Sequence, residues 1–141
     1  MSDAERSPGA TVRAYLDALN RGDADAIAAC VSEDFINEHT STLGETIVGR
    51  EAYCKRVRQF LQTFAALRYE TETMIVDGGK VAVAYRMSAL WRPAESDRSR
   101  DRPFTIRGMF RFQVEDGYIV HRVDYWDSAD FLRQVETQPK R

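Results

Sequence analysis

Residues 107–132, RGMFRFQVEDGYIVHRVDYWDSADFL, contain the side chains best suited to acid–base chemistry. Arg122, Asp124 and Trp126 recur there at every second position. Because alternate side chains of a β-strand point to the same side, a strand would place the guanidinium, the carboxylate and the indole on one face. Such a face is either solvated or lines a cavity, and in a cavity the carboxylate could act as a general acid or base.

A β-hairpin would position these three side chains. The Asp116-Gly117 pair between two apolar runs predicts strands over residues 103–114 and 118–126, because glycine adopts positive φ without steric cost. On the outgoing strand, one face carries Gly108, Phe110 and Phe112 and the other carries Arg107, Met109 and Arg111.

The outward face of the same hairpin is expected to be apolar. Its predicted members are Met109, Ile119, Val123 and Tyr125, with His121 also facing away from the cavity. A set of this size is too large to leave in contact with water, so we expect a homodimer through the outer face of the sheet.

Three helices are predicted before the sheet, beginning at Pro8, Ala24 and Gly49. Ser7-Pro8 is a typical helix start, and Gly22 a typical stop. The second helix is predicted to end at Cys30 and the third at Ala66. Tyr15 and Tyr53 fall in the apolar stripes of the first and third helices.

The remaining polar candidates lie on predicted strands. Residues 35–40 form a short extended segment with Asn37 and His39 on one face. Residues 68–76 and 81–91 form a second hairpin, whose return strand has Ala82, Ala84, Arg86 and Ser88 on one face. Small residues followed by arginine suggest a face that approaches a helix or a ligand.

Loop 93–102 and a short final helix, with Ser128 as its N-cap, complete the predicted elements. Helices followed by an antiparallel meander give an α+β domain, in which a wedge between sheet and helices could form a pocket. We divide the chain into a flexible N-terminus (1–8), one domain (9–136) and a C-terminal tail (137–141).

The composition and charge of the chain limit the classes of molecule that it is expected to bind. The 141 residues are 43% hydrophobic and 30% charged, typical of a soluble domain. A net charge of −2 argues against nucleic acid, and no apolar run is long enough for a membrane span or a signal peptide. We therefore expect a cytoplasmic protein in which Cys30 and Cys54 are buried thiols without a disulfide. No spacing resembles a metal site or a nucleotide fingerprint, so no metal and no cofactor are predicted.

The runs YLDALNRGDADAIAACVSEDF, GREAY and DGYIVHRVDYWD together resemble the nuclear transport factor 2-like (NTF2-like) superfamily. Within it the chain is most similar to SnoaL-like polyketide cyclases, ketosteroid isomerases and limonene epoxide hydrolases. The resemblance, over residues 11–135, implies a cone-shaped α+β barrel: three N-terminal helices packed on a strongly curved, mixed, mostly antiparallel sheet. It also implies an apolar cavity and a homodimer.

The resemblance matches some catalytic positions of these families to suitable residues of this chain, and others to residues of a different type. The oxyanion tyrosine of ketosteroid isomerases falls on Tyr15, their base on His39, and their protonated aspartate on Gly108. For limonene epoxide hydrolases, one aspartate falls on Asp124 and the arginine on Arg86, while the second aspartate falls on Ser88. Since both patterns are incomplete, the simpler demand of a SnoaL-like cyclase fits best: one base beside a carbonyl group in an apolar pocket.

These considerations define a candidate site. Its catalytic residues are Asp124, His39, Arg86 and Tyr15, and its substrate-binding residues are Arg122, Trp126, Phe110, Phe112, Tyr53, Asn37, Ser88 and Gly108. The base is Asp124 or His39, coupled, since a carboxylate beside an imidazole raises its pKa. Arg86 or Tyr15 would stabilise an enolate. Structural interpretations remain open: a buried ion pair of Asp124 with Arg86 or Arg122, a loop histidine at 39, and core tyrosines at 15 and 53.

Three functions follow from this site. The first is a cofactor-free enzyme that cyclises, isomerises or dehydrates a small hydrophobic carbonyl compound. The second is a non-catalytic module that binds a small ligand or forms a dimeric interaction platform. The third is an epoxide hydrolase.

Overall fold

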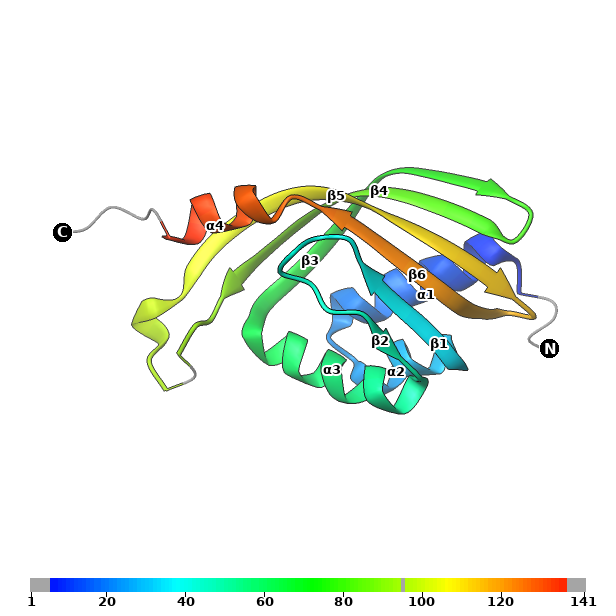
Figure 1. Cartoon of the computed structure of the whole chain (residues 1–141), viewed down its shortest axis with the longest axis horizontal. Helices are drawn as coiled ribbons and strands as arrows, with labels where there is room; N and C mark the ends of the chain where they lie inside the picture. The colour runs from blue at the N-terminus through cyan, green and yellow to red at the C-terminus, as the bar shows by residue number, and fades with distance from the viewer. Residues whose placement is uncertain (1–5, 95, 137–141) are drawn as a thin grey trace.

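A computed structural model of the chain describes residues 6–94 and 96–136 (Figure 1). The order of its elements is α1 (Pro8–Arg21), α2 (Ala24–Ala29), β1 (Val31–His39), β2 (Ile47–Val48), α3 (Arg50–Thr63), β3 (Phe64–Asp77), β4 (Lys80–Trp91), a 3-10 turn (Arg98–Arg100), β5 (Arg102–Glu115), β6 (Tyr118–Trp126) and α4 (Ser128–Glu136). Most of the predicted flexible N-terminus and the whole predicted tail, 137–141, lie outside the described residues.

The first two helices form as their capping residues predict. The Ser7 side chain accepts from the Ala10 N–H, and Gly22 ends α1 with φ 66°. The Asp23 side chain then accepts from the Ala26 N–H and starts α2. These caps satisfy backbone groups that helix ends leave unpaired.

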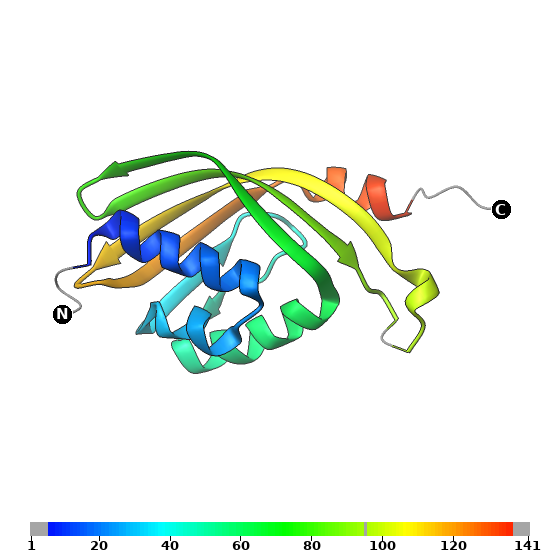
Figure 2. The ribbon, with the colours of Figure 1, turned by 180° about the vertical axis from the view of Figure 1, so that it is seen from behind.

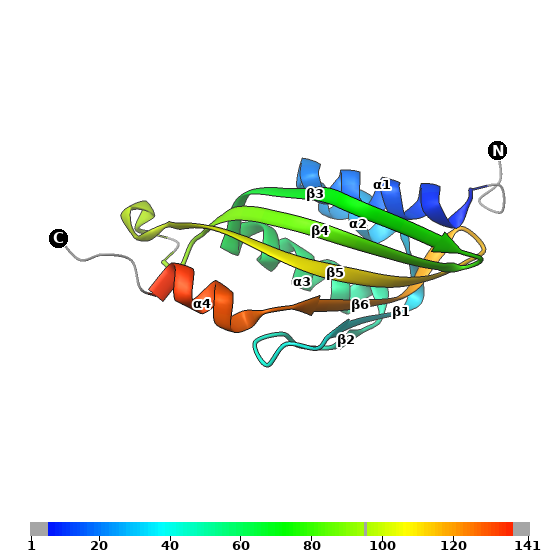
Figure 3. The same ribbon diagram turned by 90° about the horizontal axis from the view of Figure 1, so that it is seen from above.

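The six strands form one sheet in the order β2-β1-β6-β5-β4-β3. The pair β1–β6 is parallel and the other pairs are antiparallel, so the sheet is mixed. The sheet arches over α1, α2 and α3 without closing into a barrel, as Figures 1 and 2 show. Figure 3 shows the opposite, outer face of the sheet, with the three helices behind it. The predicted α+β architecture is confirmed.

The terminal hairpin has the predicted strands, but its return strand does not alternate throughout. Val114 pairs with Ile119 and Gln113 with His121, so an extra residue is inserted in β6. This bulge turns Ile119 into the core, where it is 0% exposed, and Val123 is only 1% exposed. The predicted outward set is therefore wrong for Ile119, whereas Val123 keeps its outward side, paired with the exposed Arg111, but is covered by its neighbours. Met109 and Tyr125 remain exposed, at 43% and 41%.

The two faces of β4 are oriented opposite to the prediction, so that the residues expected in the site face outward. Val81, Val83, Tyr85 and Met87 are buried on the inner face. Arg86 therefore points outward, where its side chain is 52% exposed and lies 3.7 Å from Glu72. Ser88 shares this outer side and pairs with the exposed Thr105. Burying the larger apolar set fixes this orientation, so the prediction that Arg86 and Ser88 face the cavity is wrong.

Several predicted boundaries also shift. Helix α3 ends at Thr63 rather than Ala66, because Phe64 is already extended and Ala66 adopts φ 54°. Strand β1 begins at Val31, earlier than predicted. The first turn of α4 is capped by Asp127, whose carboxylate accepts from the N–H groups of Ala129 and Asp130, and not by Ser128. Among the described residues, no helix has the length and apolar character to cross a membrane.

Candidate functional site

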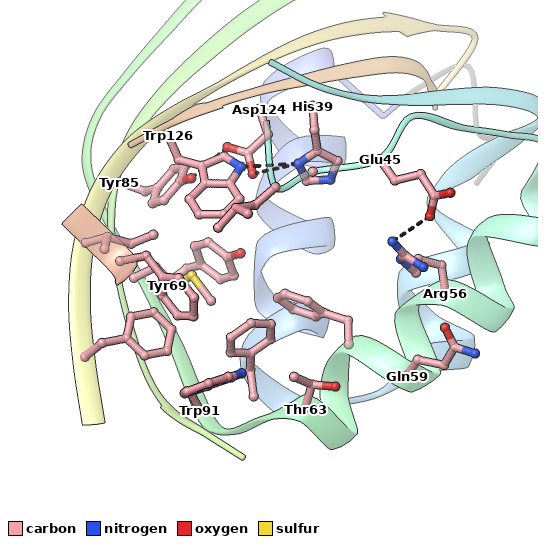
Figure 4. Close-up of a pocket in the computed structure, with 18 residues that line it drawn as sticks. His39, Glu45, Arg56, Gln59, Thr63, Tyr69, Tyr85, Trp91, Asp124 and Trp126 are labelled. Atoms are coloured by element: carbon pink, nitrogen blue, oxygen red, sulfur yellow. Dashed lines mark hydrogen bonds and ion pairs between the residues drawn. The ribbon is translucent and has the colours of Figure 1, made fainter. Parts of the chain in front are cut away.

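A pocket of about 340 Å³ lies between the sheet, α3, α4 and the segment that joins β1 to β2 (Figure 4). One end is apolar, and its lining consists of Phe60, Phe64, Met87, Trp91, Phe104, Ile106 and Phe131. The other end is polar and contains His39, Tyr69, Tyr85, Asp124 and Trp126. Three members of the predicted site, His39, Asp124 and Trp126, thus line this pocket.

Strand register brings the polar end together. His39 of β1 pairs with Asp124 of β6, and Asp124 pairs with Phe110 of β5. Two residues along on the same face, Gly108 of β5 pairs with both Trp126 and Tyr85. Four adjacent strands therefore place an imidazole, a carboxylate, an indole and a phenol on the inner face.

Asp124 is held by a phenol that the sequence analysis did not select. The Tyr85 hydroxyl donates to Asp124 Oδ1 at 2.7 Å, and both side chains are buried. A Cβ at Gly108 would collide with the Tyr85 ring and hydroxyl, so glycine provides the room for this contact. Gly108 does not line the pocket itself, contrary to the substrate-binding role predicted for it.

Burial makes Asp124 less acidic than usual. Only 6% of the residue is exposed, and desolvation raises its pKa against the opposing effects of Arg122 and the Tyr85 hydrogen bond. A carboxyl whose pKa is moved upward, toward neutrality, is a more effective general base there.

Arg122 lies behind the pocket, and its positive charge opposes the rise in the pKa of Asp124. It is 6% exposed, with its guanidinium carbon 4.6 Å from the centre of the Phe110 ring. It donates to the Tyr15 hydroxyl at 3.0 Å, and that hydroxyl is 2.5 Å from the hydroxyl of Tyr53. Tyr15, Tyr53 and Arg122 do not line the pocket, so the structure places them as a buried support layer rather than in the predicted contact with substrate.

The remaining predicted residues surround the pocket without lining it. Phe110 and Phe112 are at most 1% exposed in the core, and the edge of Tyr15 packs on the Phe112 ring. Asn37 is buried beside His39, with its amide nitrogen 3.5 Å from Nε2. The predicted faces of these residues are correct, but all three belong to the layer behind the pocket wall.

His39 is neutral at neutral pH. Burial, the Arg122 guanidinium and the Arg56 guanidinium together lower its pKa to about 3. The expectation that Asp124 raises this pKa is therefore wrong. His39 Nδ1 lies 3.7 Å from Asp124 Oδ2, but the contact is not an ion pair while the imidazole is neutral. Trp126 Nε1 lies 3.4 Å from Nδ1 and Arg122 lies 3.5 Å from Nε2, so an N–H donor faces each ring nitrogen of His39.

We predict an acid-sensitive contribution of His39 to stability. The unfolded chain binds a proton at His39 below pH 6.5, whereas the folded protein does not until about pH 3. Stability is therefore lost as pH falls through this range, by up to about 1.4 kcal/mol per pH unit. Urea unfolding across the range should show a steeper loss for the wild type than for His39→Gln. Equal slopes would contradict a neutral, buried His39.

The mouth of the pocket is formed by residues that the sequence analysis did not select. Glu45 and Arg56 form a 2.7 Å ion pair between the β1–β2 connection and α3. Gly44 packs so closely on His39 that a Cβ would clash with the imidazole. Arg56 lies on one side of α3 with three further lining residues, Gln59, Phe60 and Thr63. Their i, i+3, i+4, i+7 spacing is a helical stripe that the sequence could have revealed.

Within residues 6–94 and 96–136 there is no group of three or more His, Cys, Asp or Glu side chains arranged to hold a metal ion. Both cysteines are free thiols, as predicted, but only Cys30 is buried; Cys54 is half-buried.

Comparisons with known proteins agree with this geometry. A family model for the SnoaL-like domain matches residues 12–122. None of the curated proteins compared with the sequence gives a significant match.

Three solved structures illustrate the similarity. A candidate SnoaL-like polyketide cyclase from Shewanella denitrificans is 13% identical, with 93% of this chain and 98% of that chain covered and a TM-score of 0.82. A candidate polyketide cyclase from Xanthomonas campestris is 25% identical, with 95% and 99% covered and a TM-score of 0.74. A protein with a ketosteroid isomerase-like fold from Catenulispora acidiphila, in complex with trimethylamine, is 16% identical, with 92% and 97% covered and a TM-score of 0.77.

Proposed function

The chain belongs to the SnoaL-like domain family of the NTF2-like superfamily, and on this premise we propose that it is an enzyme acting on a small hydrophobic carbonyl compound. The proposed reaction class is acid–base chemistry next to the carbonyl group: cyclisation, isomerisation or dehydration. It uses side chains of the chain itself, without a cofactor. The polyketide cyclases among its structural neighbours support this class.

Asp124 is the proposed base. Its carboxylate takes a proton from the carbon beside the carbonyl group; the C–H electron pair becomes the C=C bond of an enolate, and the negative charge moves to oxygen. The acid form of Asp124 can then return the proton to another atom of the substrate. Nδ1 of His39 lies 3.7 Å from Oδ2, so the imidazole is the neighbouring polar group on the other side of this carboxyl from Tyr85.

The apolar end of the pocket supports a hydrophobic substrate. There the Phe131 ring packs edge to face with two other rings. Its centre is 5.8 Å from that of Trp91 and 4.9 Å from that of Phe104. These rings favour a cyclic or aromatic hydrocarbon body and keep water from the carboxylate. The substrate carbonyl would then lie at the polar end.

One observation carries the proposal: a buried carboxylate with a raised pKa lines the pocket between an imidazole and a phenol. The test is hydrogen–deuterium exchange beside the carbonyl group of indanone and tetralone in D₂O, followed by proton NMR. Acceleration by the wild-type protein would support the proposal. Binding of these ketones without accelerated exchange would instead favour the non-catalytic ligand-binding module.

Epoxide hydrolysis receives less support from the geometry. The inward positions of β4 are Tyr85 and Met87, while Arg86 and Ser88 lie on the outer face. Among the described residues that line the polar end of the pocket, Asp124 consequently has no second carboxylate beside it, and Glu45 at the mouth pairs with Arg56. Epoxide hydrolysis of this kind needs one acid to protonate the epoxide and a second to activate water, and the polar end of the pocket does not supply this pair.

We also propose a homodimer through the outer face of the sheet. Met109 and Tyr125 are paired neighbours there and remain exposed, and Arg111 donates to the Tyr125 hydroxyl. Burial of this pair against a second copy would remove apolar area from water. Light scattering should give twice the chain mass for the wild type and the single chain mass for Met109→Glu. A monomeric wild type would contradict the proposal.

A further inference from the structure

Tyr69 of β3 is the tyrosine at the polar end of the pocket whose hydroxyl is not already engaged. The residue is 7% exposed and lines the pocket. Figure 4 shows its side chain reaching into the pocket on the same side as Tyr85. In the described part of the chain, its hydroxyl makes no hydrogen bond, although its backbone does. The hydroxyl is not among the buried polar atoms that lack a partner, so it is accessible from the pocket, where a ligand or water can accept its hydrogen bond.

The other tyrosines near the polar end are occupied. The Tyr85 hydroxyl donates to Asp124, and Tyr15 and Tyr53 bond to each other beside Arg122. Arg86, the second enolate stabiliser expected from the sequence, lies outside the pocket. The positions suggested by the family resemblance therefore leave the substrate oxygen without a donor.

The position of Tyr69 is fixed by α1 and by its neighbouring rings. Asn20 donates to the Tyr69 carbonyl at 3.0 Å and accepts from the Tyr69 N–H at 2.7 Å. The Tyr69 ring packs edge to face on Tyr85, with 5.1 Å between centres, and lies 5.4 Å from the ring of Phe110. These contacts involve the backbone and the ring of Tyr69, so they fix its position and leave its hydroxyl able to donate to a ligand.

We propose that Tyr69 is a catalytic residue that donates its hydroxyl hydrogen bond to the carbonyl oxygen of the substrate as this oxygen becomes an enolate. The inference rests on the proposed function. Negative charge moves from the C–H bond to the substrate oxygen, the Asp124 carboxylate takes the proton, and the phenol keeps its own proton throughout. Burial and the nearby Asp124 raise the pKa of Tyr69, which keeps the phenol protonated and able to donate.

Tyr69→Phe tests the assignment, with Tyr125→Phe on the outer face as the matched control. Removal of one oxyanion donor is expected to lower the ketone exchange rate by roughly 10²- to 10³-fold. Tyr125→Phe should leave the rate unchanged. Tyr15→Phe should lose less than Tyr69→Phe, since its hydroxyl serves Arg122 and Tyr53. A Tyr69→Phe rate equal to that of the wild type would overturn the proposal.

A second readout separates this inference from the proposed function. Indanone labelled with carbon-13 at the carbonyl should show a downfield shift when bound to the wild type or to Asp124→Asn. The shift should disappear in Tyr69→Phe. If exchange is absent but the Tyr69-dependent shift is present, the base assignment fails and the donor assignment holds. If the shift persists in Tyr69→Phe, or if the wild type binds no ketone, the donor assignment is overturned.

Discussion

Asp124→Asn is expected to lower the rate of exchange beside a ketone carbonyl by roughly 10²- to 10⁴-fold, the range that a positioned general base contributes. The amide has nearly the shape of the carboxylate and can still accept the Tyr85 hydrogen bond, which is 2.7 Å long in the wild type. It cannot take a proton from carbon. The loss should therefore appear in the rate and not in the affinity for the ketone, as measured by proton NMR and by ligand titration.

Glu38→Gln is the matched control for this substitution. Glu38 lies on β1, next to the strand that carries Asp124, and its carboxylate bonds His121 on the outer side at 2.9 Å. The same carboxylate-to-amide change there should leave exchange unaffected. Full activity in Asp124→Asn, or an equal loss in both variants, would show that Asp124 is not the base.

Arg122→Met is expected to cost up to about 3–5 kcal/mol of unfolding free energy, the effect of removing one partner of a direct buried ion pair, because Arg122 acts on Asp124 through its nearby charge and not through a direct contact. Arg122 is 6% exposed and supplies the positive charge that favours ionised Asp124. Without it, a buried carboxylate is left uncompensated, and the Tyr15 hydroxyl loses its donor. Urea unfolding at neutral pH measures this loss.

Two further measurements separate the charge effect from lost packing. Without Arg122, the pKa of Asp124 rises further above its unfolded value, so stability is lost as pH rises through that higher pKa. The penalty should accordingly be smaller in acid. The double variant Arg122→Met/Asp124→Asn should recover part of the loss, because the buried negative charge is gone. A penalty independent of both pH and Asp124 would mean that Arg122 acts through packing alone.

The sequence by itself determined the elements with strong local signals. Ser7 and Gly22 bound α1 because a hydroxyl cap and a left-handed glycine satisfy backbone groups locally. The Asp116-Gly117 turn produced the terminal hairpin, and the return strand has the predicted bounds, Tyr118–Trp126. Alternation grouped Asp124 with Arg122 and Trp126, and His39 with Asn37. The element order predicted the α+β class, and the family resemblance directed both groups into one cavity.

Only the tertiary structure decided which alternating face is buried and which side chains meet. Alternation divides β4 into two sets, but packing against the helices chose Tyr85 over Arg86. The bulge in β6 reversed Ile119, because one inserted residue shifts every earlier side chain to the other face. The low pKa of His39 and the position of Tyr69 depend on burial and on Arg122, Arg56 and Asn20, which come from three different elements. Such properties arise from long-range contacts, which no local pattern in the sequence specifies.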